Sequence, residues 1–343
     1  MNANLQENIA PPKGQVVEAT DLKERAEKLS ALLLSDEMPD YDKNIIIRAM
    51  EEFCNYSDKM TEIRDLPKVT IFGGARIEKG SAEYRLAKEI GEIMSNVGYK
   101  VITGAGPGIM EAGHEGATTK NSVGYAVELP FEEATNGYVS KSKYLVNCKY
   151  LFTRKVMLLR EADAVVCVGP GFGTMDELFE ILTLIKTGKN IPIPVVLLED
   201  ESNPIWTKFL DFCKVLEKAN TISHQDLYLF RICQNAEDAA DYINNFYKRY
   251  HSIRYVGDRL VIRLKTPLPE ELYKSICQEY EDFIGEWGLV YTDALPEESD
   301  EKDIIALPRL VMKENRKDPV GLYRLIRSLN RDVDTTSTKR QDR

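Results

Sequence analysis

The sequence predicts an α/β protein built on a doubly wound, Rossmann-like parallel sheet, with a helical N-terminal extension and a small α+β C-terminal appendage. Short, continuously apolar segments alternate with amphipathic helical segments, which is typical of strands buried on both faces of a sheet. Glycine-rich turns follow three of these apolar segments, at the carboxyl ends where parallel sheets bind ligands. The 343 residues suffice for two domains, or for one large domain with extensions.

The N-terminal segment is predicted to be helical. Residues 1–20 are polar, and from 21 to 64 apolar residues recur at three- and four-residue steps. Pro67 ends this segment. We therefore expect a helical extension over residues 1–66.

A sheet domain is expected over residues 67–249. Its expected strands are residues 68–72, 99–103, 123–128, 164–168 and 194–198. Its expected helices are residues 81–96, 108–119, 153–162 and 176–187.

The pattern changes after Tyr250, and residues 250–343 are expected to form the appendage. Residues 259–265 alternate apolar and charged side chains, as a half-exposed strand does. Further strands are expected at 289–292 and 304–312, and helices at 269–284 and 321–329. The last residues, 335–343, are polar and are expected to be disordered.

Composition excludes several classes of protein. The net charge of −10 argues against binding of a nucleic-acid polymer, although a local basic pocket for one phosphate remains possible. The longest apolar runs are far shorter than a membrane span, and no secretory signal is evident. The six cysteines are scattered, and the three histidines lie far from one another and are not at zinc-site spacing from a cysteine. We therefore expect a reduced, cytoplasmic protein without a His/Cys metal site.

The most informative segment is Gly169-Pro-Gly-Phe-Gly-Thr-Met-Asp-Glu177, which joins an apolar strand to an amphipathic helix. Glycines at such a junction let backbone N–H groups approach an anion, and the helix N-terminus adds positive potential. Glu177 places a carboxylate beside that anion, which suggests chemistry on a bound nucleotide. Alternatively, Thr174 and Glu177 form a capping box that only satisfies the helix N-terminus.

Two other glycine turns follow strands, at residues 73–76 and at Gly104-Ala-Gly-Pro-Gly108. Three such turns at one sheet edge predict a phosphate-lined crevice. The second turn, with Glu128 twenty residues later, also invites a dinucleotide interpretation. Its spacing is G-x-G-x-G instead of G-x-G-x-x-G and includes Pro107, which disfavours a nicotinamide cofactor.

Arg154 and Lys155 begin a helix whose next residues are apolar. Such pairs are usually surface charges. A cation near a helix N-terminus opposes the dipole, however, and a guanidinium suits phosphate or carboxylate recognition. Arg154 and Glu177 are therefore predicted to face one crevice.

Four ordered blocks resemble the signature of the LOG ("lonely guy") family, whose members are often mislabelled lysine decarboxylases. The resemblance spans residues 68–199, and its blocks are Gly104-Ala-Gly-Pro-Gly-Ile-Met-Glu111, Leu129-Pro-Phe-Glu132, Phe152-Thr-Arg-Lys-Val-Met157 and Gly171-Phe-Gly-Thr-Met-Asp-Glu177. It implies a cytoplasmic, homo-oligomeric (at least homodimeric) nucleoside 5′-monophosphate phosphoribohydrolase that releases free base and ribose 5-phosphate. Neither cofactor nor metal is implied.

The resemblance also implies roles for individual residues. Arg154 and Glu177 fall on the catalytic arginine and glutamate, with Glu177 stabilising an oxocarbenium-like state or activating water. The residues expected to bind substrate or phosphate are Gly104, Gly106, Gly108, Lys155, Gly171, Phe172, Gly173, Thr174 and Thr183, with Arg76 a weaker candidate. Asp176 is expected to point elsewhere.

Two departures from the family pattern stand out. The family's Pro-Gly-Gly reads Gly169-Pro170-Gly171, so that Pro170 offers no N–H to phosphate, and Leu151-Phe152-Thr153 replaces the plant-type Met-His-Glu. The second change argues against cytokinin specificity. A nucleotide- or cofactor-binding sensor without hydrolysis is the alternative, whereas no lysine lies in the context that a pyridoxal phosphate decarboxylase requires.

Overall fold

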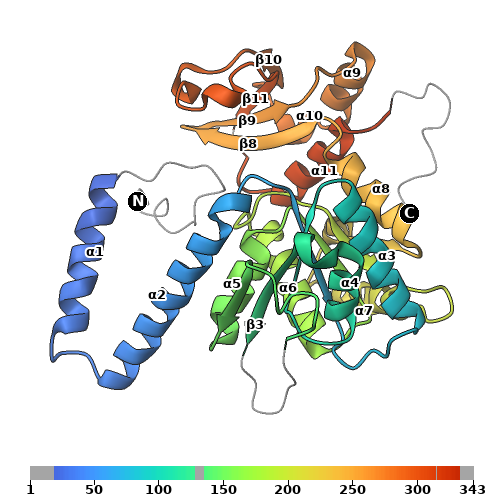
Figure 1. Ribbon diagram of the computed structural model, residues 1–343. Coiled ribbons are helices and arrows are strands. Elements are labelled where there is room, and N and C mark those ends of the chain that lie inside the picture. The colour runs from blue at the N-terminus through green and yellow to red at the C-terminus, as the bar shows by residue number, and fades with distance from the viewer. Residues whose placement is uncertain (1–18, 128–134, 314, 333–343) are drawn as a thin grey trace. The chain divides into compact units, whose positions relative to one another are not determined.

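A computed structural model of the chain describes residues 19–127, 135–313 and 315–332 (Figure 1). The chain forms two compact units. The first contains residues 1–181, 195–215 and 230–240, and the second contains residues 182–194, 216–229 and 241–343. The expected division into 1–66, 67–249 and 250–343 stays a prediction.

The first unit contains a seven-stranded, wholly parallel sheet with strand order β4-β3-β2-β1-β5-β6-β7. The strands are β1 (Lys68–Gly73), β2 (Lys100–Thr103), β3 (Ser122–Val127), β4 (Leu145–Cys148), β5 (Ala164–Val168), β6 (Val195–Leu198) and β7 (Arg231–Cys233). The order reverses between β1 and β5, which is the switch point where such sheets bind ligands. The predicted α/β doubly wound class is confirmed.

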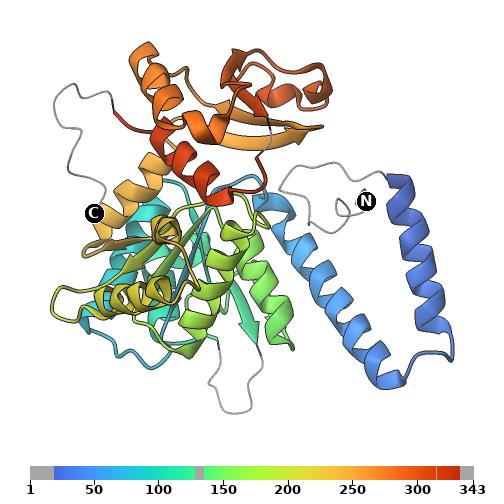
Figure 2. The same ribbon diagram turned by 180° about the vertical axis from the view of Figure 1, so that it is seen from behind.

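Helices cover the sheet in the manner of a Rossmann-like fold, as Figure 2 also shows from behind. They are α3 (Ala82–Asn96), α4 (Ile109–Asn121), α5 (Leu151–Arg160), α6 (Phe172–Lys186), α7 (Ile205–Lys218) and α8 (Ala236–Phe246). Every residue of β5 is fully buried, which explains its uninterrupted apolar sequence. The edge strands β4 and β7 were not predicted, because they have only four and three residues and are partly exposed.

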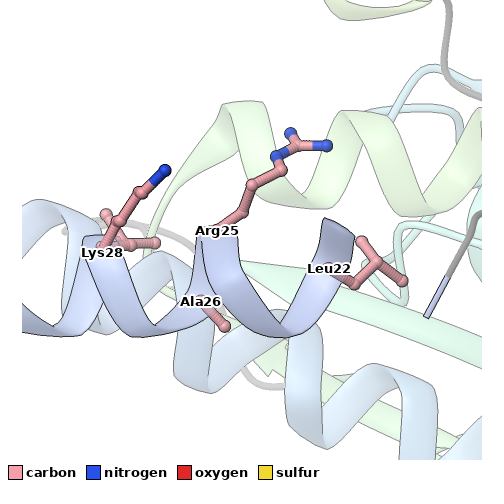
Figure 3. A pocket seen from close by; sticks show the side chains of 5 residues that line it. Leu22, Arg25, Ala26 and Lys28 are labelled. Atoms are coloured by element: carbon pink, nitrogen blue, oxygen red, sulfur yellow. The ribbon is translucent and has the colours of Figure 1, made fainter. Parts of the chain in front are cut away.

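The N-terminal helical segment consists of two helices, α1 (Ala19–Leu34) and α2 (Asp40–Met60), separated by a turn that ends at Pro39. The buried residues of α2 are Glu52, Tyr56 and Met60, on one line of the helix. A shallow hollow along α1 is lined by Leu22, Arg25, Ala26, Lys28 and Leu29 (Figure 3). None of these five residues belongs to the predicted site.

The second unit contains an antiparallel sheet with strand order β10-β11-β9-β8. Its elements are β8 (Tyr250–Val256), β9 (Arg259–Leu264), α9 (Glu270–Glu279), α10 (Glu281–Ile284), β10 (Val290–Thr292), β11 (Arg309–Lys313) and α11 (Pro319–Leu329). The predicted α+β character is confirmed. Strand β8 was missed, and it pairs with β9 through a turn in which Gly257 has φ +60°.

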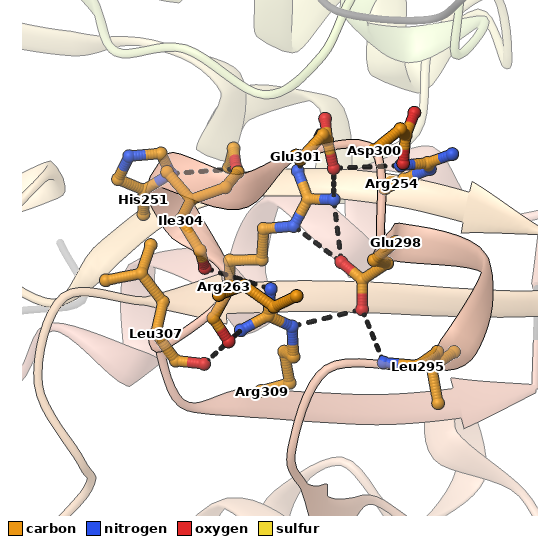
Figure 4. A network of polar contacts seen from close by, with 12 residues as sticks. His251, Arg254, Arg263, Leu295, Glu298, Asp300, Glu301, Ile304, Leu307 and Arg309 are labelled. Atoms are coloured by element: carbon orange, nitrogen blue, oxygen red, sulfur yellow. Dashed lines mark hydrogen bonds and ion pairs between the residues drawn. The ribbon is translucent and has the colours of Figure 1, made fainter.

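A buried ionic network joins this sheet to the loop before β11 (Figure 4). The Glu298 carboxylate is fully buried, and it accepts hydrogen bonds from Nε of Arg263 (2.8 Å) and Nε of Arg309 (3.0 Å). Burial alone would raise the pKa of Glu298, but the N–H of Leu295 and the two arginines hold that pKa below its usual range. Because each charge is paired, the network fixes the loop without leaving a buried charge uncompensated.

Candidate functional site

The three glycine turns meet at the carboxyl edge of the parallel sheet. The N–H of Gly74, after β1, donates to the carbonyl of Gly169 after β5 (3.1 Å). The N–H of Ile109 donates to the carbonyl of Gly74 (3.2 Å), which ties the turn after β2 to the same group. The predicted convergence of the three turns is confirmed.

Gly108 is required by this close approach. Its φ is +66°, and a Cβ built on it would touch the carbonyl oxygen of Gly74 and lie 2.7 Å from that of Ala75. Gly104 and Gly106 instead lie under the side chain of Met110, whose Sδ would be 2.9 Å from a Cβ on Gly104. The glycines therefore let two turns and one side chain share a small volume.

Helix α6 begins at Phe172, four residues before the expected start at 176. The N–H of Met175 already donates to the carbonyl of Gly171 (2.9 Å), so that Thr174 lies within the first turn and is not the N-cap. The capping-box interpretation of Thr174 and Glu177 is therefore wrong. The N–H groups of the first turn have no intrahelical acceptors and form a site suited to an anion.

Glu177 is the buried carboxylate of this site. Its side chain is only 7% exposed, and among the described residues nothing donates a hydrogen bond to its buried Oε2. Burial raises the pKa of Glu177 to about 7, although Lys155 and Arg154 act to lower it. A carboxyl group with such a pKa can exchange protons at neutral pH.

Lys155 pairs with acidic groups of α6. Its ammonium lies 2.6 Å from Oδ2 of Asp176 and 2.7 Å from Oε2 of Glu180. This arrangement argues against the phosphate-binding role predicted for Lys155. It also keeps Asp176 on the outer side of the helix, where 65% of its side chain is exposed.

Arg154 extends from α5 to the turn after β2. A Cβ built on Gly104 would lie 3.4 Å from Nη1 of Arg154, so the guanidinium lies against that glycine. The positive charge of Arg154 acts to lower the pKa of Glu177. The structure thus brings the two predicted catalytic residues to one place, as their spacing alone could not establish.

Two residues that sequence reasoning did not assign to the site shape the turn after β2. The Asn136 side-chain amide donates to the carbonyls of Ala105 (3.1 Å) and Gly106 (3.0 Å). The same amide lies 3.2 Å from Nδ1 of fully buried His114, whose Nε2 lies 3.0 Å from the carbonyl of Val123. Ala105 has φ +65°, an unfavourable conformation for a non-glycine residue, which these contacts hold in place.

The remaining predicted residues differ in position. Gly171, Phe172 and Gly173 are exposed at the start of α6, and Thr174 is 5% exposed. Thr183 is exposed, and it lies about 9 Å further along the helix axis than Glu177. Its role therefore stays a prediction. Arg76 is exposed in the turn after β1, while Glu128 and the block 129–132 lie outside the described residues.

Residues 109–243 match the family model described as "Possible lysine decarboxylase". The chain is also similar to an uncharacterized protein of Archaeoglobus fulgidus, 26% identical over 136 residues, which are 39% of this chain and 85% of that protein. The range of the family model includes Arg154 and Glu177. Each match covers less than half of this chain, and neither specifies a reaction.

Solved structures with a similar fold belong to several kinds of protein. The molybdenum cofactor carrier protein of Chlamydomonas reinhardtii is 20% identical with a TM-score of 0.38, covering 52% of this chain and 96% of that one. TM1055 is 24% identical with a TM-score of 0.37, covering 52% and 98%. DNA processing protein A of Helicobacter pylori is 17% identical with a TM-score of 0.38, covering 56% and 85%. At these scores the likeness carries no argument about ligands.

In the ranges given above, no group of three or more His, Cys, Asp or Glu side chains is arranged to hold a metal ion. None of the helices in those ranges is both long and apolar enough to cross a membrane.

Proposed function

We propose that this protein hydrolyses the N-glycosidic bond of nucleoside 5′-monophosphates, giving the free base and ribose 5-phosphate. The observation that carries the proposal is the position of Glu177. Its buried carboxylate, with a pKa raised to about 7, lies one turn into a helix whose N-terminus suits a phosphate. Few arrangements need both an anion site and a protonatable carboxylate so close together.

In the proposed reaction, water adds to C1′ of the ribose as the C1′–N bond breaks. The electron pair of that bond leaves with the base, which gains a proton, and the water loses one. Glu177 stabilises the oxocarbenium-like state or accepts the proton from water. Arg154, against the Gly104 turn, orients the phosphate or the departing base.

Phosphate would bind at the first turn of α6, where the N–H groups of Phe172, Gly173 and Thr174 have no intrahelical acceptor. Gly171 and Gly173 have nothing within 4 Å of an added Cβ, which leaves open space above the turn. In this proposal, Gly104, Gly106 and Gly108 contribute to the other side of the substrate site. No cofactor takes part in this scheme.

The test is incubation of the purified protein with a panel of nucleoside monophosphates, including isopentenyl-AMP, with base and ribose 5-phosphate measured by chromatography. Release that disappears in Glu177→Ala supports the hydrolase and identifies the base. Binding detected by calorimetry without release would favour the nucleotide- or cofactor-binding sensor instead.

We also propose that the protein forms a homodimer or larger homo-oligomer. Exposed apolar side chains gather on α5 and the start of α6: Leu151 is 56% exposed, Phe152 51%, Val156 42% and Phe172 100%. Such a patch is unusual on a monomer surface. Light scattering should give at least twice 39.0 kDa, and Phe172→Ser should weaken the assembly.

All six cysteines are free thiols, four of them buried. We propose a reduced, cytoplasmic setting for this enzyme, as the scattered cysteines of the sequence suggest.

A further inference from the structure

Helix α5, which carries Arg154, begins without the residues that normally stabilise a helix N-terminus. Its N-cap residue, Tyr150, makes no side-chain capping hydrogen bond, and the first turn contains no acidic residue. The first five positions instead include the cations Arg154 and Lys155, which oppose the helix dipole. Local sequence therefore leaves the orientation of this helix start weakly determined.

Glu52, on α2, binds the chain on both sides of the start of α5. Its Oε1 accepts a hydrogen bond from the N–H of Lys149 (2.8 Å), and its Oε2 accepts one from Oγ1 of Thr153 (2.5 Å). The Glu52 side chain is only 3% exposed, and Thr153 is fully buried. A carboxylate from a helix about one hundred residues earlier in the chain thus holds the residue before the N-cap and the third residue of α5.

The other end of α5 is attached to α2 as well. Tyr56, one turn after Glu52, donates a hydrogen bond to Glu161, which directly follows α5. Glu161 in turn lies 3.3 Å from the ammonium of buried Lys68 on β1. Because both ends of α5 are fixed to one face of α2, the helix is held against rotation and sliding.

The consequence concerns Arg154, which directly follows Thr153. Its guanidinium must reach Gly104 from this helix, and small changes at the helix start would move it across the crevice. We propose that Glu52 is a positioning residue for Arg154, so that the N-terminal extension is part of the active site's framework. This inference rests on the proposed function only for its effect on catalysis.

Two substitutions separate the hydrogen bonds of Glu52 from its charge. In Glu52→Gln the amide oxygen can accept from Lys149, and the amide nitrogen can donate to Oγ1 of Thr153. The Thr153 hydroxyl then donates to the carbonyl of Tyr150, 2.9 Å away. Glu52→Ala removes both contacts, together with the ion pair of Glu52 with Arg48 (3.6 Å). Glu51→Ala is the matched control, because Glu51 is 60% exposed and also pairs with Arg48.

The first test is a comparison of crystal structures of the wild-type protein and Glu52→Ala. We expect the Arg154 guanidinium to leave Gly104 in Glu52→Ala and to stay in Glu52→Gln and Glu51→Ala. An unmoved guanidinium in Glu52→Ala overturns the inference, whether or not the protein hydrolyses nucleotides. If Glu52→Ala does not fold, Thr153→Val removes one of the two contacts and is judged by the same criterion.

The second test measures kcat/KM for the substrate found in the panel, or the Kd of AMP if no nucleotide is hydrolysed. Glu52→Ala should lower kcat/KM, or weaken binding, at least tenfold, and Glu52→Gln should restore most of the loss. In the Arg154→Ala background, Glu52→Ala should have no further effect, because the residue acts through Arg154. Equal losses in both backgrounds would show a merely structural role and overturn the inference.

Discussion

The guanidinium of Arg154 lies against the backbone of Gly104, where a Cβ would be only 3.4 Å from Nη1. These residues belong to α5 and to the turn after β2, and fifty positions separate them in the chain. The contact places a permanent positive charge at the glycine turn after β2. Glu177, which that charge helps to ionise, lies on α6.

Gly104→Ala should therefore reduce the proposed activity. The added methyl group would lie 2.9 Å from Sδ of Met110 and 3.4 Å from Arg154, so both side chains must shift. We expect kcat/KM to fall about tenfold or more, since small displacements of positioning groups are costly. Gly137→Ala is the control, because nothing lies within 4 Å of its added Cβ. Equal activities in the two variants would contradict the prediction.

The pH dependence of the reaction should follow the ionisation of the Glu177 carboxyl group. If the carboxylate form acts, kcat/KM should rise with pH and reach half its maximum at about pH 7, the value to which burial raises the pKa of Glu177. Steady-state kinetics from pH 5.5 to 8.5 measure this profile. A flat profile over that range would exclude an ionising role for the group.

Lys155→Ala should move that profile to higher pH. The ammonium of Lys155 lowers the pKa of Glu177 more than any other group does, so its removal leaves Asp176 and Glu180 to raise that pKa further. We expect a shift of about half to one pH unit, with little change in KM. The pKa of the phosphate in the free substrate is the same for both proteins, so a difference between their profiles reports the enzyme. Lys208→Ala serves as a control. A large increase in KM without a shift would instead support phosphate binding by Lys155.

Glu177→Gln should stabilise the protein at alkaline pH while abolishing activity. The folded protein holds the Glu177 proton up to about pH 7, whereas the unfolded chain releases it near pH 4.5, so stability decreases as the pH rises between these values. At pH 8 the free energy of unfolding of the variant should be about 1–3 kcal/mol higher than that of the wild-type protein. At pH 4.5 the difference should vanish. Urea titrations measure both values, with the exposed Glu92→Gln as control.

His114 should make the fold sensitive to acid. Burial lowers the pKa of His114 to about 4, so between pH 6.5 and 4 the unfolded chain binds a proton that the folded chain does not. Stability should fall through this window by on the order of 3 kcal/mol. His114→Gln should reduce the slope of unfolding free energy against pH, and His224→Gln, on an exposed residue, should not. Identical slopes in all three proteins would contradict the assignment.

Much of the fold could be predicted because its signals are local. Buried strands such as β5 read as apolar runs, and glycines mark the turns that follow β1, β2 and β5. Strands β4, β7 and β8 escaped prediction because they are short or partly exposed. The start of α6 was placed too late, since glycine and threonine disfavour helix in isolation while the i to i−4 bond from Met175 begins the helix at Phe172.

By itself, then, the sequence determined the sheet, the meeting of three glycine turns at one edge, and the candidacy of Arg154 and Glu177. The pairing of Lys155 with Asp176 and Glu180 and the binding of Glu52 to Lys149 and Thr153 became visible only in the folded chain. The physical reason is range. Helices, strands and turns follow from neighbouring residues. Ion pairs, the hydrogen bonds of Glu52 and the burial that raises the pKa of Glu177 arise between segments that meet only when the chain has folded.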